Sequence, residues 1–427
     1  MKRLIIAAIA LALAGPAMAQ DLRDLDRRMT AIEEKLQKLE QGSDVAELRR
    51  EIDVLSREIE ALKNVQEKPA AQANVSQYGL GAAASKVYRS APGLSIGGYG
   101  EFVYQNFRSG ETDTADWVRA VVYTGYKFND RMLFNSETEI EHGNLEHGGN
   151  VEMEFGYLDY LVKPQFNLRA GLVLMPVGLI NELHEPTAYF GARRPAVEDR
   201  IIPTTWSEAG VGAFGDVGRL TYRAYLVTGL QSSRFDAQSA IREGRQGAAE
   251  AAAGKWAAVG RLDFHPVEGT LFGGSLYSGN SGQDSRFNAR VTLGEVHAES
   301  KFRGLTLRGL YARGTTGDAA RINEANGLAG DASIGKSFGG WYAEGGYQLF
   351  TRGDFSLTPY TRIERFDTQR SVPAGYLRNP ENNRRLFTIG LAAKPVPQTV
   401  IKFDWQKGTN RARTGTNQFN VGLGYIF

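Results

Sequence analysis

From Leu94 onward, apolar and polar residues alternate in short runs along the chain. In the last run, NQFNVGLGYIF, the large apolar residues from Phe419 to Phe427 share one parity, and Asn420 and two glycines take the other. Successive side chains of a β-strand point to opposite faces, so a period of two predicts strands with one apolar face. The same alternation occurs in LSIGGYGEFVYQNF, DWVRAVVYTGYKF, RMLFNSETEIEH, VEMEFGYLDYLVK and FNLRAGLVLMP.

The connections between these runs alternate in length. Short ones fall at residues 129–130, 163–165, 215–218 and 265–269, whereas residues 231–254 and 314–330 form long, charged connections. Short turns at one end and long loops at the other are typical of an up-and-down membrane barrel. We therefore expect residues 94–427 to form an all-β transmembrane barrel of about sixteen antiparallel strands, with lipid covering the apolar parity. A soluble β-sandwich would explain neither the alternation of loop lengths nor the number of strands.

The first 64 residues follow other patterns. Residues 1–19 combine Lys2 and Arg3, an apolar stretch, Pro16 and small residues before a cut, which predicts a secretory signal peptide with Gln20 as the first mature residue. A retained membrane anchor is the alternative, but the apolar stretch is too short to span a bilayer.

Residues 20–64 carry two heptad seams, which predict an α-helical coiled coil in front of the barrel. The seams break near Gly42 and Ser43, at either a stutter in one continuous coil or the corner of a helical hairpin. Residues 65–93, rich in Ala, Gln and Ser, are expected to be a flexible linker. The seams consist of Leu22, Leu25, Met29, Ile32, Leu36 and Leu39, and of Val45, Leu48, Ile52, Leu55, Ile59 and Leu62.

Composition narrows the class further. The exported chain has no Cys, which excludes a disulfide scaffold, and its 50 Gly together with abundant Tyr and Phe suit a curved membrane barrel. The formal net charge of +2 is near neutral, and we expect no nucleic-acid partner.

The runs GLSIGGYGEF, LFNSETEIEHG and LRAGLVLMPVGLINELHEPTAYFGARRP, with the terminal Phe, resemble Gram-negative outer-membrane porins. The resemblance covers residues 94–427 and is closest to the phosphate-selective porin O and P family. It implies an outer-membrane location, a homotrimer of sixteen-stranded barrels, and Phe427 as an assembly signal read by the barrel assembly machinery. The coiled coil would then lie in the periplasm and fits a trimer, although many such porins lack one.

Residues 176–206 form an unusually long connection, which falls where porins have their constriction loop. Folded into the lumen, its mixed charges would narrow the pore and sort solutes. The alternative is a loop that packs outside or on a neighbouring subunit. The charged residues are Glu182, His184, Glu185, Arg193, Arg194, Glu198, Asp199 and Arg200.

Strand parity assigns further charges to the pore wall. The expected basic lining is Arg119, Lys127, Arg169, Arg223, Arg261, Arg290, Arg308, Arg362, Arg384 and Lys402. The expected acidic lining is Glu137, Glu139, Glu141, Glu152, Glu154, Asp263, Glu364 and Asp404. Arg suits brief contacts with phosphate or carboxylate, but these charges are equally what any water-filled lumen would show. Because Lys is sparse and acids are frequent, an anion or phosphate preference stays open.

Enzyme chemistry finds no support in the sequence. His142 and His147 in EHGNLEHGG have carboxylate neighbours, but loop polarity explains them better than a metal site, and we expect neither metal nor cofactor. The sequence therefore predicts passive diffusion of small hydrophilic solutes and ions. The alternative is a structural tether that links the outer membrane to the cell wall through the coiled coil, with the barrel as its anchor.

Overall fold

The computed structural model describes residues 76–427 except 109, 144–145, 147 and 284–286. The signal peptide and the coiled coil expected for residues 1–64 lie outside the described residues. No helix among those that the structure describes is long and apolar enough to cross a membrane.

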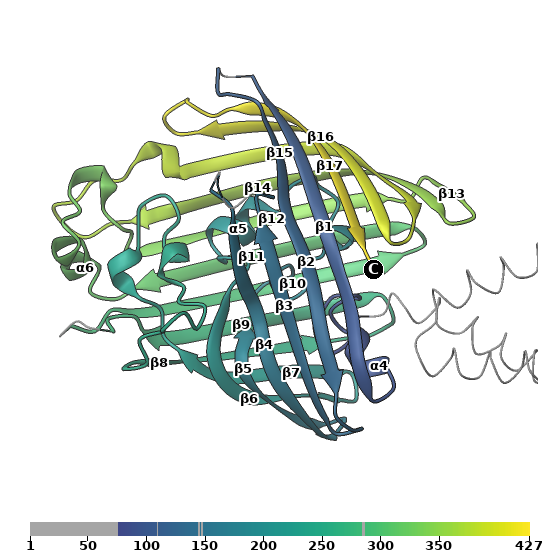
Figure 1. Cartoon of the computed structure of the whole chain (residues 1–427). Coiled ribbons are helices and arrows are strands. Elements are labelled where there is room, and N and C mark those ends of the chain that lie inside the picture. The colour runs from purple at the N-terminus through teal and green to yellow at the C-terminus, as the bar shows by residue number, and fades with distance from the viewer. Residues whose placement is uncertain (1–75, 109, 144–145, 147, 284–286) are drawn as a thin grey trace, which may run out of the picture. The chain divides into compact units, whose positions relative to one another are not determined.

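Sixteen long antiparallel strands form a closed barrel, in which each strand pairs with its neighbours along the chain and β1 pairs with β17 (Figure 1). The prediction of about sixteen antiparallel strands is confirmed. A short extra strand, β13 (Phe350–Arg352), pairs with β14 beside the turn that follows β12. The barrel strands are β1 (Gly93–Phe107), β2 (Thr114–Lys127), β3 (Met132–Glu141), β4 (Asn150–Lys163), β5 (Phe166–Leu174), β6 (Ser207–Val217), β7 (Leu220–Thr228), β8 (Trp256–Phe264), β9 (Thr270–Asn280), β10 (Arg290–Phe302), β11 (Leu305–Thr316), β12 (Ser337–Tyr347), β14 (Phe355–Ser371), β15 (Asn383–Val396), β16 (Thr399–Asn410) and β17 (Asn417–Ile426).

The last residue completes the closure. The backbone N–H of Phe427 donates to the carbonyl of Gly98 at 2.9 Å, and the N–H of Gly98 donates back at 3.1 Å. The rings of Tyr425 and Phe427 stack with their centroids 6.4 Å apart. Closure matters because an open edge would leave unpaired backbone groups facing lipid.

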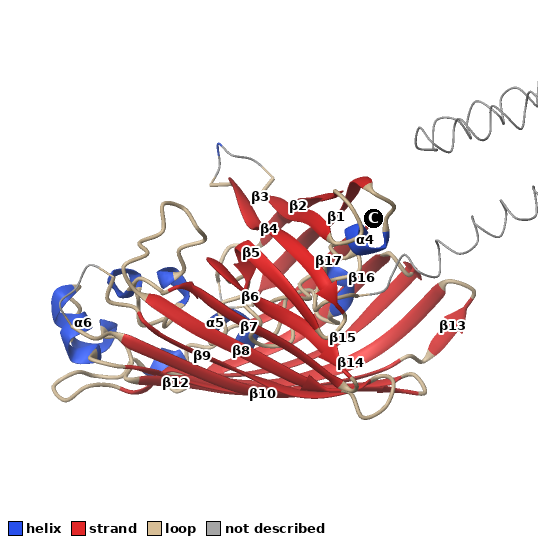
Figure 2. Ribbon diagram, turned by 90° about the horizontal axis from the view of Figure 1, so that it is seen from below, coloured by secondary structure: helices blue, strands red, loops and turns tan. Residues whose placement is uncertain are grey.

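The two ends of the barrel differ. Turns of a few residues follow β2, β4, β6, β8, β10 and β15, and we call this the short-turn end. Longer connections gather at the opposite, long-loop end, where α6 (Ala319–Ala325) lies (Figures 1 and 2). The other helical elements are α4 (Lys86–Arg89), α5 (Ala196–Arg200), η2 (Pro186–Ala188), η3 (Ser232–Arg234), η4 (Arg242–Gly244), η5 (Gly330–Ala332) and η6 (Pro380–Asn382).

The outer wall of the barrel is apolar. Along β4, Leu158 and Tyr160 are exposed, whereas Tyr157 and Asp159 between and beside them are buried on the inside. The same alternation leaves Phe272, Leu276 and Val296 exposed on other strands, along with many further large apolar residues. Such a continuous apolar outer face is what a hydrocarbon surrounding requires.

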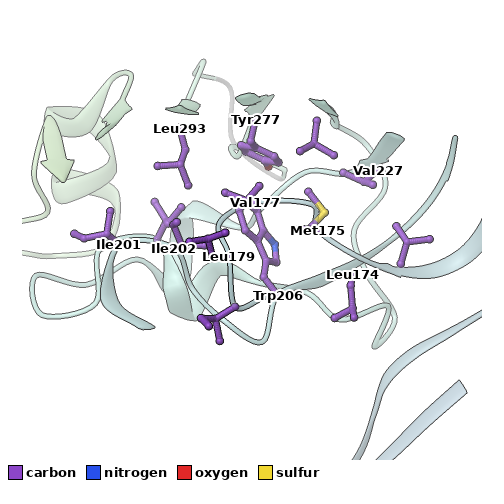
Figure 3. Packing of buried hydrophobic residues seen from close by; sticks show 14 of the residues in the cluster. Leu174, Met175, Val177, Leu179, Ile201, Ile202, Trp206, Val227, Tyr277 and Leu293 are labelled. Carbon is purple, nitrogen blue, oxygen red and sulfur yellow. The ribbon is translucent and has the colours of Figure 1, made fainter. Parts of the chain in front are cut away.

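The interior also holds an apolar core, which the sequence did not lead us to expect (Figure 3). Inward residues of the wall pack on the connection between β5 and β6, and the rings of Trp206 and Tyr277 lie 4.8 Å apart. On β10, Leu293 points into this core and is fully buried. Apolar residues therefore occupy inward as well as outward positions of the wall.

This interior core corrects one predicted pore residue. Val291 and Leu293 share a parity and are buried inside, so Arg290 points outward. Its guanidinium donates to the hydroxyl of Ser278 at 3.1 Å, on the outer face of the neighbouring strand β9. The parity argument was wrong here because it took every apolar face for a lipid-facing one.

Candidate pore and constriction

Residues 176–206, the constriction loop, run through the lumen and bind the opposite wall. The N–H of Ala192 donates to Asp404 of β16 at 2.7 Å, and the N–H of Val197 donates to Glu364 of β14 at 3.1 Å. The hydroxyl of Tyr189 donates to a carboxylate of β1. The loop therefore divides the inside of the barrel.

Buried polar side chains hold the loop in shape. Asn181 donates to the carbonyls of Met175 at 2.7 Å and Trp206 at 2.9 Å, which ties the two ends of the loop together. Glu198 accepts from the N–H of Ile180 at 2.9 Å and from the hydroxyl of Tyr342 at 2.7 Å. Because buried backbone groups need partners, these contacts favour a single conformation.

A second inward loop, residues 229–255, covers the constriction loop from the long-loop end. Arg242 donates to Asp199 with Nη1 and Oδ1 2.9 Å apart, and Arg245 donates to the carbonyl of Pro203 at 3.2 Å. Sequence reasoning missed these residues. The signal was present in the long, charged connection at residues 231–254, but its inward path depends on contacts with another loop.

Above the constriction loop lies a cavity of about 940 Å³ toward the long-loop end. The two loops contribute five arginines and two carboxylates to its lining: Arg193, Arg194, Arg200, Arg242, Arg245, Asp199 and Glu243. The strands contribute Arg119, Arg384, Glu101, Glu141 and Glu152. The connections after β1 and β14 add Glu111 and Glu381. The two inward loops thus make one side of the cavity positive, and the five carboxylates and two arginines of the remaining lining make the other side equally negative.

Asp199 is at the centre of the arginines. It contacts Arg242 at 2.9 Å and Arg200 at 3.2 Å. Burial works to raise the pKa of Asp199, but the neighbouring arginines outweigh it and hold that pKa below its usual value. Burial lowers the pKa of Arg242 to about 10, so its charge persists at neutral pH. One ionised carboxylate therefore faces several guanidinium groups.

Eight of the predicted pore residues line this cavity. They are Arg119, Glu141, Glu152, Arg193, Arg194, Asp199, Arg200 and Arg384. Arg119 also lies 3.5 Å from Glu139, which is fully buried in the wall behind it.

Most other predicted pore residues point inward but are buried in polar contacts. The ion pairs are Arg169 with Asp159 at 2.8 Å, Arg223 with Glu182 at 3.1 Å, Arg261 with Asp263 at 2.8 Å, Arg308 with Glu299, Arg362 with Glu364 at 2.8 Å, and His184 with Glu137 at 3.1 Å. Glu154 accepts from the hydroxyl of Thr205, and Glu185 accepts from backbone N–H groups. A charge buried without a partner is costly, so each of these pairs neutralises charge inside the barrel. Arg223–Glu182 and His184–Glu137 also join the wall to the constriction loop.

The two lysines predicted to line the pore, Lys402 and Lys127, have different surroundings. Nζ of Lys402 lies 3.7 Å from the ring centroid of Tyr189 in the constriction loop, a cation–π geometry. Nζ of Lys127, near the short-turn end, donates to the carbonyl of Ser90 at 3.2 Å and lies 3.6 Å from Asp130.

Residues 76–92, within the segment expected to be a linker, lie inside the barrel with the short helix α4. The hydroxyl of Tyr88 donates to Asp159 at 2.6 Å and accepts from Arg169 at 2.9 Å. The structure therefore places an ordered N-terminal segment in the lumen below the constriction loop.

Within the described ranges, no group of three or more His, Cys, Asp or Glu side chains is placed to hold a metal ion. His142, in the outer loop considered for a metal, lies with Nδ1 2.9 Å from Asp116.

No family model matches the sequence. An uncharacterized protein of Aquifex aeolicus is 35% identical over 363 residues, which cover 82% of this chain and 83% of that protein. The chain belongs to the family of this Aquifex protein.

Two solved structures of low sequence identity resemble this chain in fold. OmpT, an outer membrane protein of Vibrio cholerae solved in a trimer form, is 11% identical with a TM-score of 0.51, over 79% of this chain and 100% of OmpT. Salmonella typhi OmpF, in complex with daunomycin, is 12% identical with a TM-score of 0.53, over 78% of this chain and 97% of OmpF. This likeness shows a porin-like sixteen-stranded barrel and does not single out the phosphate-selective porins.

Proposed function

We propose that the protein is an outer-membrane channel for passive diffusion of small hydrophilic solutes, with a preference for small anions bearing carboxylate or phosphate groups. The observation that carries the proposal is the positive side of the cavity above the constriction loop, where the five arginines of the two inward loops outnumber the two carboxylates of the same loops. No bond is made or broken, and the protein contributes width, charge and shape.

The arrangement of charge suits brief binding. A guanidinium offers paired donors to carboxylate or phosphate oxygens, and several weak sites allow a solute to leave as readily as it enters. Asp199 and the wall carboxylates Glu141 and Glu152 repel anions and so limit how tightly an anion binds in the cavity. We therefore expect a modest preference for anions as a class, rather than tight specificity for phosphate.

The proposal includes the orientation of the barrel in the membrane and its assembly into a homotrimer. The long loops would face the outside and the short turns the periplasm, with both chain ends on the periplasmic side. A homotrimer is supported by the heptad seams of residues 20–64 and by the trimer form in which OmpT was solved.

Reversal potentials in planar bilayers test the proposal. Under a chloride gradient the purified protein should show stepwise conductance with a reversal potential biased toward the anion, and added phosphate should reduce the chloride current. The double variant Arg193→Gln/Arg384→Gln removes two cavity charges whose side chains hold no other charged group in a described ion pair, and the reversal potential should move toward the cation side.

A matched control is Arg313→Gln, since Arg313 is exposed on β11 with the outward parity. It should leave the reversal potential unchanged. An unbiased reversal potential in the unmodified protein would refute the anion preference but keep the channel. Absence of conductance would refute the channel and favour the tether through residues 20–64.

A further inference from the structure

Residues 76–92, here called the luminal segment, lie between the constriction loop and the short-turn end, against one side of the wall. Lys86 donates to the carbonyl of Ile96 on β1 at 2.8 Å, and Asn135 of β3 donates to the carbonyl of Ala84 at 2.9 Å. Tyr78 packs on Phe214 of β6 with the ring centroids 5.1 Å apart. With the contacts to β2, β4 and β5, the segment touches six consecutive strands. Figure 1 shows α4 near the C-terminus, at the end opposite α6.

The luminal segment is bound to the constriction loop by one buried carboxylate. Glu185 accepts from the N–H of Ala83 at 2.9 Å and from the N–H of Ala84 at 3.1 Å. Burial raises the pKa of Glu185, and the two N–H groups act against that rise. Since the constriction loop itself reaches β14 and β16, the two elements together extend from one side of the lumen to the other.

The wall is shaped to receive the luminal segment. A Cβ added to Gly125 of β2 would lie 2.6 Å from a methyl carbon of Val87, and one added to Gly97 of β1 would lie 3.1 Å from the carbonyl of Ala83. Because glycine has no side chain, Gly125 and Gly97 leave space on the wall that the luminal segment fills. Val87 and Leu80 are buried as completely as core residues.

Withdrawal of the luminal segment would leave the barrel intact. Its one β-bridge, between Gln77 and Leu80, is internal, and β1 pairs with β2 and β17 without it. The Arg169–Asp159 pair beneath Tyr88 has two direct contacts, at 2.8 and 2.9 Å, in which no atom of the segment takes part. The wall so uncovered includes the polar Asn135 and Asp159 and the apolar Phe214.

We infer that the luminal segment is a removable plug, which narrows the short-turn mouth of the channel when docked and widens it when withdrawn. This inference rests on the proposed channel function. The segment enters β1 through Pro92 and Gly93, where the positive φ of Gly93 (125°) gives the backbone a bend that favours glycine. That junction is the natural hinge.

A cysteine lock tests the plug in the full-length protein. The chain has no native Cys, so Val87→Cys/Gly125→Cys introduces one pair, at positions where the added Cβ atom would lie 2.7 Å from the Cβ of Val87. A shift of about 1 Å brings the pair to ordinary disulfide geometry. Single-channel conductance is recorded for the same preparation after oxidation and after reduction.

We expect the oxidised pair to hold the channel at a conductance about twofold below the larger level reached after reduction, because conductance follows the open width. Val87→Cys alone, treated in the same way, is the control and should show no change. Equal conductance in both states would overturn the plug, and so would failure of the disulfide to form. No current in either state, with the disulfide formed, would instead refute the channel function.

Discussion

Replacement of Arg169 by Met tests whether the inward charges of the wall are held as buried pairs. Arg169 is about 1% exposed and donates two hydrogen bonds to Asp159, at 2.8 and 2.9 Å. Its guanidinium also stacks 3.9 Å from the ring centroid of Tyr157 and 4.7 Å from that of Phe214. Met fills similar volume but supplies no charge and no donor.

The expected loss in the free energy of unfolding follows from the hydrogen-bond donors that Asp159 keeps. Asp159 is fully buried and would keep only the hydroxyl of Tyr88 as a strong donor among the contacts described. Removing one partner of a buried ion pair costs about 3–5 kcal/mol, mostly because the other charge stays buried. The double variant Arg169→Met/Asp159→Leu removes both charges, so most of that loss should be recovered.

Equilibrium unfolding by urea in lipid vesicles, followed by Trp fluorescence, measures the free energy of unfolding. The control Arg131→Met changes an exposed residue in the turn between β2 and β3 and should cost less than about 0.5 kcal/mol. A cost below about 1 kcal/mol for Arg169→Met would refute the reasoning, as would a double variant no more stable than the single one.

Three further predictions concern the segment, the closure and the assembly. Gly125→Ala should cost about 1–3 kcal/mol of unfolding free energy, because its Cβ meets Val87, and Val87→Ala added to it should restore most of the loss. Phe427→Ser should lower the heat-modifiable folded fraction on gels, since the stacked ring at the closing strand is lost, whereas the exposed Val267→Ser in a turn should not. The proposed homotrimer is tested by deletion of residues 21–62, which should lower the molar mass measured by light scattering and keep the conductance of each pore. An unchanged molar mass would exclude these residues as the assembly element.

The barrel could be predicted from the sequence. Alternation and loop length are local properties: a strand in lipid needs an apolar outer face at every second position, and in an up-and-down membrane barrel a short turn follows every second strand. Both signals repeat along residues 94–427, so errors in single runs did not change the strand number.

Which residues fill the lumen could be learned only from the tertiary structure. Parity separates inside from outside only where the inside is water, and it failed at Arg290 because Leu293 joins an apolar core within the barrel. It also could not tell Arg384, which lines the cavity, from Arg362, which is buried between Glu344 and Glu364. Those outcomes depend on loops that reach across the barrel.

The sequence alone therefore determined the shell: strand number, antiparallel order and the apolar outer face, because each rests on residues near one another in the chain. Only the tertiary structure decided what the shell encloses. Arg242 reaches Asp199, and Glu185 reaches Ala83, across 43 and 102 residues of sequence. Contacts over such separations are chosen by the packing of the whole interior, and no local pattern encodes them.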